Sequence, residues 1–150
     1  MNNMVNLRTD DRAREMWDRN RELAIVIGEL CDPDMPPPME TLYVRVKKAR
    51  KPTRPDVVLQ KKVERRITLI NSIIERGLDP EDSIVVRTII DKAGNEIFEF
   101  LDGTHRACIL LGLGLPVYAK NVGSDTAYWD LAQAMAQHPL DKYPLSEETE

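Results

Sequence analysis

The sequence predicts an α+β fold in which helices cover a small mixed sheet. One observation is the helical period at 56–76, where apolar side chains recur every three or four residues. A second is the run of apolar and β-branched residues at 84–90 and 96–101, which is typical of strands. A third is the passage from the second of these strands directly into another helix and then into a strand at 116–122. With a strand before the long helix, the order is strand, helix, strand, strand, helix, strand, which fits the α+β class.

The composition indicates a single globular domain with its own core. The chain has 150 residues, of which 42% are hydrophobic and 31% charged. This length and balance are usual for an ordinary domain. No apolar run approaches the length of a bilayer span, and the first residues lack the apolar centre of a signal peptide. We therefore expect a cytoplasmic protein without a membrane partner.

The N-terminal part predicts helix followed by a stiff connector. Residues 8–30 carry Trp17, Leu23, Ile27 and Leu30 near helical spacing, with many charges between them. The segment 32–38 contains four prolines and excludes helix. We therefore interpret 1–38 as a helical extension with a proline-rich connector, which packs on the core or on a partner.

The core is expected at 39–123 and opens with a strand and a long helix. Residues 41–46 alternate apolar and charged side chains, which predicts a half-buried strand. Asp56 can cap the following helix, whose apolar face includes Ile70 and Ile74. Gly77 ends this helix in the manner expected of a glycine.

A hairpin and a last strand complete the predicted core. The strands 84–90 and 96–101 are joined across 91–95, where Gly94 supplies turn chemistry. The helix after the second strand ends near Gly112 or Gly114. Beyond the core, 124–150 is predicted to be a helix, at 125–137, followed by an acidic tail.

The joint between the second strand of the hairpin and its helix is the most polar place in the core. Asp102 closes the strand, Gly103 can adopt angles that other residues avoid, and Thr104 can cap the helix with its hydroxyl. His105 and Arg106 fall in the first helical turn, where unpaired N–H groups and the positive end of the dipole gather. Two cationic side chains at this end repel each other unless an anion lies between them, so we predict a phosphate-binding site.

Cysteine and histidine content argues against a zinc site or a disulfide. The chain has only Cys31, Cys108, His105 and His138, without the spacing of zinc ligands. Both cysteines lie in or after apolar stretches and are expected to be small buried residues. A disulfide is not expected in the cytosol.

The charge is distributed unevenly along the chain. The net charge is −4, yet residues 45–66 hold ten basic and two acidic side chains. Such a basic segment favours phosphate groups, nucleic acid or an acidic protein as partner. A solvated strand and helix face is the equal alternative.

Residues 42–122 resemble the ParB/sulfiredoxin-like superfamily. Three pieces carry the resemblance in order: the end of the helix at 71–78, the strand at 83–86, and the motif at 100–106 followed by an apolar helix and a strand. Members of this superfamily bind nucleotide phosphates at the matching joint. The resemblance therefore implies ATP or another nucleotide with Mg²⁺ as ligand. Arg106 would clamp the phosphate, and His105, Gly103 and Thr104 would assist.

Within the superfamily the motif is closest to the free serine kinases, which phosphorylate a small hydroxyl substrate. Asp102 matches the acid of their joint and would accept a proton or hold Mg²⁺. Asp56 is the only acid near the loop in which these kinases place a second one, and Arg54 would reach the phosphates from the same loop. Thr104 replaces the reactive cysteine of sulfiredoxins, so sulfiredoxin activity is not expected. Too few residues follow the core for a helix-turn-helix domain.

Other readings of these residues stay open. Asp102 is equally well explained as a turn residue that accepts hydrogen bonds from the start of the helix. The protein could be a non-enzymatic nucleic-acid or nucleotide-binding module of plasmid or phage type, with DNA held at 45–66. It could also be an interaction factor without chemistry, or a homodimer joined through its terminal helices.

Overall fold

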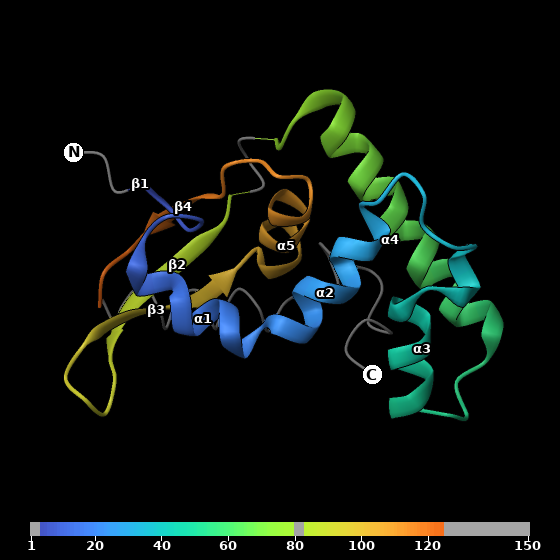
Figure 1. Ribbon diagram of the computed structural model, residues 1–150, viewed down its shortest axis with the longest axis horizontal. Coiled ribbons are helices and arrows are strands. Elements are labelled where there is room, and N and C mark those ends of the chain that lie inside the picture. The colour runs from blue at the N-terminus through green and yellow to red at the C-terminus, as the bar shows by residue number, and fades with distance from the viewer. Residues whose placement is uncertain (1–3, 80–82, 125–150) are drawn as a thin grey trace, which may run out of the picture.

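The structure, a computed structural model, describes residues 4–79 and 83–124. Figure 1 shows the sheet on one side of the molecule and most of the helices on the other. The elements in chain order are β1 (Met4–Asn6), η1 (Asp11–Ala13), α1 (Arg14–Arg19), α2 (Arg21–Leu30), η2 (Pro38–Glu40), α3 (Leu42–Arg50), α4 (Asp56–Arg76), β2 (Val85–Ile90), β3 (Glu96–Asp102), α5 (Thr104–Gly112) and β4 (Tyr118–Asn121). The predicted α+β class, with helices around a small mixed sheet, is confirmed. The helix predicted at 125–137 and the acidic tail lie outside the described residues.

The described strands form one sheet in the order β1-β4-β2-β3. Strands β2 and β3 are antiparallel and form the predicted hairpin, with Thr88 opposite Phe98. In its turn, the backbone N–H of Asn95 donates to the Asp91 carboxylate across 2.9 Å, and Gly94 has a φ of 86°. Strand β4 is parallel to β2 and antiparallel to β1, so the sheet is mixed.

The strand predicted at 41–46 is wrong, because these residues begin helix α3. The hydroxyl of Thr41 caps the helix by accepting a hydrogen bond from the Val44 N–H across 3.4 Å. The N–H of Leu42, which the helix itself leaves unpaired, donates to a carboxylate oxygen of Glu29 across 2.7 Å. The first strand of the sheet is instead β1, which the sequence analysis did not assign. The first strand of the sheet therefore precedes the N-terminal helices, and the predicted order, with a helix at 8–30 before that strand, is wrong at this point.

The helical prediction for residues 8–30 is confirmed, with a break at Asn20 between α1 and α2. Side chains of this region contact strand β3 directly. The Trp17 ring meets Phe100 edge to face at 5.7 Å between centroids, and the Arg12 guanidinium lies 4.5 Å from the centre of the Phe98 ring. The Trp17 indole N–H also donates to the Leu7 carbonyl across 2.8 Å. These contacts fix the N-terminal helices on the sheet.

Helix α4 confirms the long helix predicted at 56–76, and Gly77 ends it with a φ of 76°. Two details differ from the prediction. Pro55 occupies the capping position, and the Asp56 carboxylate instead accepts a hydrogen bond from the Lys48 ammonium across 3.0 Å. Ile74, predicted to lie on the apolar face, is 59% exposed, because the helix turns this position away from the core.

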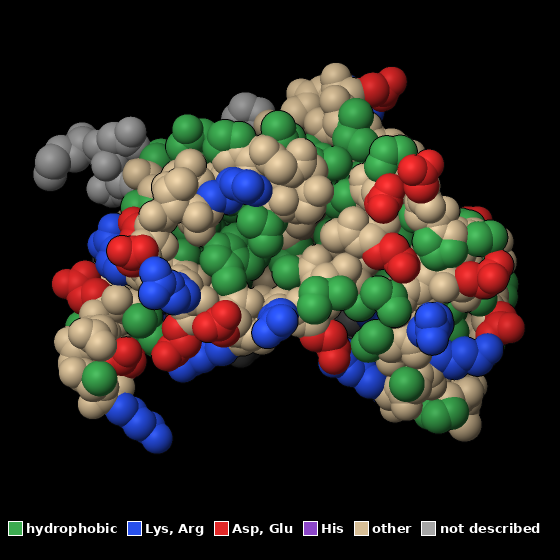
Figure 2. Space-filling view, viewed as in Figure 1, with side chains coloured by type: hydrophobic (Ala, Val, Ile, Leu, Met, Phe, Trp, Pro, Cys, Tyr) green, Lys and Arg blue, Asp and Glu red, His purple; other side chains and the backbone are tan. Residues whose placement is uncertain are grey.

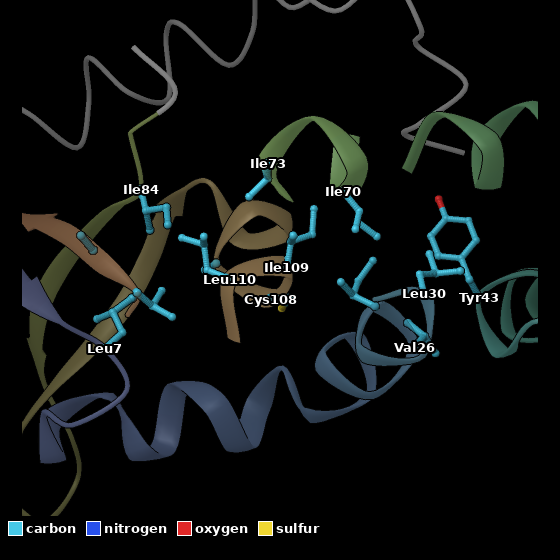
Figure 3. Close-up of a cluster of buried hydrophobic side chains, with 14 of the residues drawn as sticks. Leu7, Val26, Leu30, Tyr43, Ile70, Ile73, Ile84, Cys108, Ile109 and Leu110 are labelled. Carbon is cyan, nitrogen blue, oxygen red and sulfur yellow. The ribbon is translucent and has the colours of Figure 1, made fainter. Parts of the chain in front are cut away.

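One hydrophobic core joins the N-terminal helices to α4, α5 and the sheet. In Figure 3 Leu110 and Ile109 of α5 lie between Ile84, just before β2, and Ile70 of α4. Helices α2 and α5 approach closely where Gly112 meets Gly28, since a Cβ on Gly112 would lie 3.2 Å from the Gly28 Cα. None of the helices in the described part of the chain is both long and apolar enough to cross a membrane.

Candidate functional site

The predicted joint between strand and helix is present. Strand β3 ends at Asp102, Gly103 takes a left-handed conformation with φ 83°, and α5 begins at Thr104. A Cβ on Gly103 would lie 3.0 Å from the Cα of Ile84, so the joint also needs glycine for space. The prediction that Thr104 caps the helix is wrong, because Gly103 occupies the capping position and Thr104 is already helical.

Arg106 faces the start of β2. Its Nη1 donates a hydrogen bond to the Ser83 carbonyl across 3.1 Å. The guanidinium also lies next to Gly103, with Nη1 3.2 Å from where a Cβ would stand. Arg106 therefore links the first turn of α5 to the chain just before β2.

His105 instead lines a cavity of about 490 Å³ between helices α2, α3 and α5. Residues at the end of α1 and in α2 form one wall, and a face of α3 forms the other. In Figure 2 the molecular outline is indented between α1 and α2 on one side and α3 on the other. The lining residues are Arg19, Asn20, Glu22, Leu23, Val26, Tyr43, Val46, Lys47, Arg50 and His105.

Helices α2 and α3 run antiparallel along this cavity. Glu29, near the end of α2, bonds the Leu42 N–H at the start of α3, and Glu22, near the start of α2, forms an ion pair with Arg50 at the end of α3. The ion pair of Glu22 and Arg50 therefore marks one end of the cavity. At the other end lie Val26 and Tyr43, both buried.

Helix α5 runs parallel to α2. The Cys31 thiol, just after α2, contacts the Ile109 carbonyl across 3.8 Å, and Gly112 lies against Gly28. Seven residues earlier on α5, His105 faces the cavity beside the first half of α2. The N-terminal turn of α5, where the positive end of the helix dipole lies, thus borders the cavity through His105.

The structure brings together only part of the residues predicted for the site. His105 lines the cavity, and the basic segment contributes Lys47 and Arg50 to it. Six other predicted residues are not among its lining side chains: Asp102, Gly103, Thr104, Arg106, Arg54 and Asp56. Asp102 is exposed at the end of β3, and Arg54 is buried in the loop before α4.

The basic segment 45–66 does not form a uniform solvated face. Lys62 is fully buried and Arg54 is 8% exposed. Lys48 pairs with Asp56, and the Lys47 ammonium lies 5.1 Å from the centre of the Tyr43 ring. The cations of this segment therefore lie in several different environments and do not form one continuous surface.

Sequence reasoning missed the residues that α1, α2 and α3 contribute: Arg19, Asn20, Glu22 and Tyr43. A signal was present at Tyr43, Val46, Lys47 and Arg50, which have the spacing of one helical face. Reading 41–46 as a strand concealed it.

The metal and thiol chemistry of the described residues is limited. Within residues 4–79 and 83–124, no three His, Cys, Asp or Glu side chains are grouped so that they could share a metal ion. Burial raises the pKa of Cys31 to about 11, and burial together with the charge of Cys31 raises the pKa of Cys108 to about 12. Both thiols are therefore protonated at neutral pH; the predicted burial is confirmed for Cys108, whereas Cys31 is only partly buried. Mg²⁺ held through a nucleotide needs only one or two protein carboxylates, so that ligand stays a prediction.

The fold and the site define a small α+β protein with a polar cavity lined by helices. Comparison with protein families, curated proteins and solved structures found no match for this chain. The resemblance to the ParB/sulfiredoxin-like superfamily stays a prediction.

Proposed function

We propose that this protein binds a nucleotide in the cavity between α2, α3 and α5, with the phosphate groups on its cationic side chains. The observation that carries the proposal is the lining itself. Arg19, Lys47 and Arg50 place three cationic side chains around one opening, and His105 adds an imidazole. Guanidinium groups can bond two phosphate oxygens at once, and lysine adds a point charge.

The volume and the lining of the cavity are also suited to a small ligand. A volume of about 490 Å³ falls in the usual range of small-molecule sites. Leu23, Val26 and Val46 supply an apolar wall, against which the uncharged part of a nucleotide can be buried. Asn20 and Tyr43 add polar groups that can orient it.

We further propose ATP-dependent phosphoryl transfer to a small hydroxyl substrate as the activity, which is the reaction that the family resemblance implies. A proton acceptor for the hydroxyl must lie within hydrogen-bond reach of the ligand. His105 and Glu22 line the cavity, whereas Asp102 does not. His105 and Glu22 are therefore the preferred candidates for the base.

Isothermal titration with ATP, ADP and CTP, each with and without Mg²⁺, tests the binding proposal. Lys47→Ala and His105→Ala should each weaken binding at least tenfold, since a hydrogen bond to a charged group contributes about 1.5–3 kcal/mol. Lys92→Ala is the matched control, because Lys92 is an exposed lysine in the hairpin turn. Absence of binding, or equal affinity of all three variants and the wild type, would refute the proposal. ADP release with serine as a trial acceptor tests the reaction separately.

The alternative of nucleic-acid binding through 45–66 gains less support. Two of its ten cations are buried and two are in ion pairs, so these four are not directed at a nucleic-acid backbone. Binding of duplex DNA that weakens steeply with added salt and is lost in Lys61→Ala, which changes an exposed cation outside the cavity, would favour that alternative.

A further inference from the structure

The net charge of the chain is concentrated in one stretch of its sequence. Residues 125–150, which lie outside the described part of the chain, hold six of the 25 acidic side chains and one of the 21 basic ones. That stretch therefore carries a net charge of −5, whereas residues 1–124 carry +1, against −4 for the whole chain. A slightly cationic part is thus joined to a strongly acidic one, and opposite charges attract each other at short range.

The cavity between α2, α3 and α5 has the charge to hold an acidic stretch. Its described lining contains three cations, Arg19, Lys47 and Arg50, and the carboxylate of Glu22, so its positive charges exceed its negative ones by two. The Arg19 and Arg50 side chains are 58% and 67% exposed, and each is in an exposed ion pair. Such pairs contribute little to stability, so a further carboxylate can join or replace the present partners at low cost.

Residues 139–150, which we call the acidic segment, match both parts of this lining. The segment contains four carboxylates and a single lysine. It also carries the apolar side chains of Leu140, Tyr143 and Leu145. The cavity offers cations to the carboxylates, and its apolar wall from α2 and α3 offers a contact to these three side chains.

The chain that follows β4 is long enough to bring the acidic segment to the cavity. Residues 125–137 span about 20 Å if they form the helix that the sequence predicts. The twelve residues of the segment add up to about 40 Å when extended. Together these lengths exceed the diameter of a domain of this size, whose radius of gyration is about 15 Å.

Resting on the proposed function, we propose that the acidic segment binds the cationic side chains of the cavity in the same molecule and competes with the nucleotide for them. Covalent attachment gives the segment a local concentration of about a millimolar, so even a weak interaction occupies the cations for much of the time. The phosphates of a nucleotide must then displace these carboxylates. The acidic segment is therefore autoinhibitory, and its removal or neutralisation raises the affinity for the nucleotide.

A full-length variant in which the carboxylates of the acidic segment become amides tests the competition. This amide variant combines Asp141→Asn, Glu147→Gln, Glu148→Gln and Glu150→Gln. In isothermal titration at low salt, ATP should bind it at least about threefold more tightly than the wild type. The difference should shrink at high salt, which screens the attraction between the segment and the cavity.

A second quadruple variant is the matched control, because it raises the net charge by the same amount at exposed acids that do not line the cavity. It combines Asp34→Asn, Glu40→Gln, Glu64→Gln and Glu75→Gln. Its affinity for ATP should stay close to that of the wild type, and both quadruple variants should keep the thermal midpoint of the wild type. An equal gain of affinity in the two variants would overturn the proposal, since net charge alone would then explain it.

A synthetic peptide of residues 139–150 tests the location without any nucleotide. Added to the amide variant at up to about millimolar concentration, it should bind, as followed by NMR. Arg19→Gln together with Arg50→Gln in the same protein should weaken this binding at least about threefold, since hydrogen bonds to two charged groups are lost. Lys92→Gln removes an exposed cation in the hairpin turn and should leave the binding unchanged. A peptide that does not bind, or that binds equally well without the two arginines, overturns the proposal.

The outcomes distinguish this inference from the proposed function. If ATP binds the wild type and the amide variant equally well, the competition is overturned and the nucleotide site stands. If no variant binds a nucleotide, the proposed function fails and the competition fails with it, while the peptide titration still decides whether the segment binds the cavity. An ATP affinity of the wild type that falls as the protein concentration rises would place the segment of a second copy in the cavity and overturn binding within one molecule.

Discussion

The Arg106 guanidinium donates a hydrogen bond to the Ser83 carbonyl across 3.1 Å, while the neighbouring His105 lines the cavity between α2, α3 and α5. Consecutive residues of a helix point about 100° apart, so one turn serves two purposes. Arg106 attaches the helix to the chain just before β2, and His105 belongs to the lining of the cavity.

Arg106→Ala should therefore lower stability more than it lowers affinity. Loss of the bond to Ser83 should reduce the free energy of unfolding by about 1 kcal/mol, measured by urea denaturation. Nucleotide affinity should fall less than in His105→Ala. A large loss of affinity at unchanged stability would instead return Arg106 to the role of phosphate clamp that the sequence suggested.

Gly103→Ala should be among the most damaging single substitutions in the joint. The residue has a φ of 83°, and its Cβ would lie 3.0 Å from the backbone Cα of Ile84, which no side-chain rotation can relieve. We expect a loss of at least about 2 kcal/mol. Gly94→Ala, with a φ of 86° and open space around the new Cβ, should cost only about 1 kcal/mol. Equal losses in the two variants would show that space at Ile84 is unimportant.

The contact between α2 and α5 predicts opposite effects at its two glycines. A Cβ on Gly112 would lie 3.1 Å from the Cys31 Sγ, so Gly112→Ala should separate the helices and cost about 1–2 kcal/mol. A Cβ on Gly28 meets nothing within 4 Å, and this residue lies inside a helix. Gly28→Ala should therefore stabilise the protein by about 0.5–1 kcal/mol, measured in the same denaturation experiment.

The two cysteines should resist alkylation in the native protein. The thiolate is the reactive form, and at pH 8 a thiol with a pKa of about 11 is almost entirely protonated. Iodoacetamide labelling of Cys31, followed by mass spectrometry, should be roughly a hundredfold slower than in urea and should accelerate as the pH rises from 8 to 10. Rapid labelling of the native protein at pH 8 would contradict the raised pKa.

The elements that the sequence predicts correctly are those with a strong local pattern. Helix α4 has its helical period and Gly77, and the hairpin has its alternation and Gly94. Segment 41–46 carries a pattern compatible with both states, and contacts outside it decide the outcome. The Glu29 carboxylate, thirteen residues earlier, satisfies the Leu42 N–H and so favours helix.

The residues of the candidate site also fall into those that a local sequence pattern predicts and those that only tertiary packing brings together. His105 could be found from the sequence because the strand, the glycine and the helix start around it are adjacent in the chain. Glu22 and Arg50 meet only through the packing of α2 against α3, which no local pattern records. The sequence alone therefore identifies His105 but not the residues of α2 and α3 that complete the cavity.

The place of β4 between β1 and β2 has a consequence for biosynthesis. Val5 pairs with Ala119, more than a hundred residues later, so β1 leaves the ribosome long before its partner exists. The hairpin of β2 and β3 needs only neighbouring residues and can form early. The N-terminal strand must wait for nearly all of the described chain, and its docking should be a late event in the maturation of the newly made polypeptide.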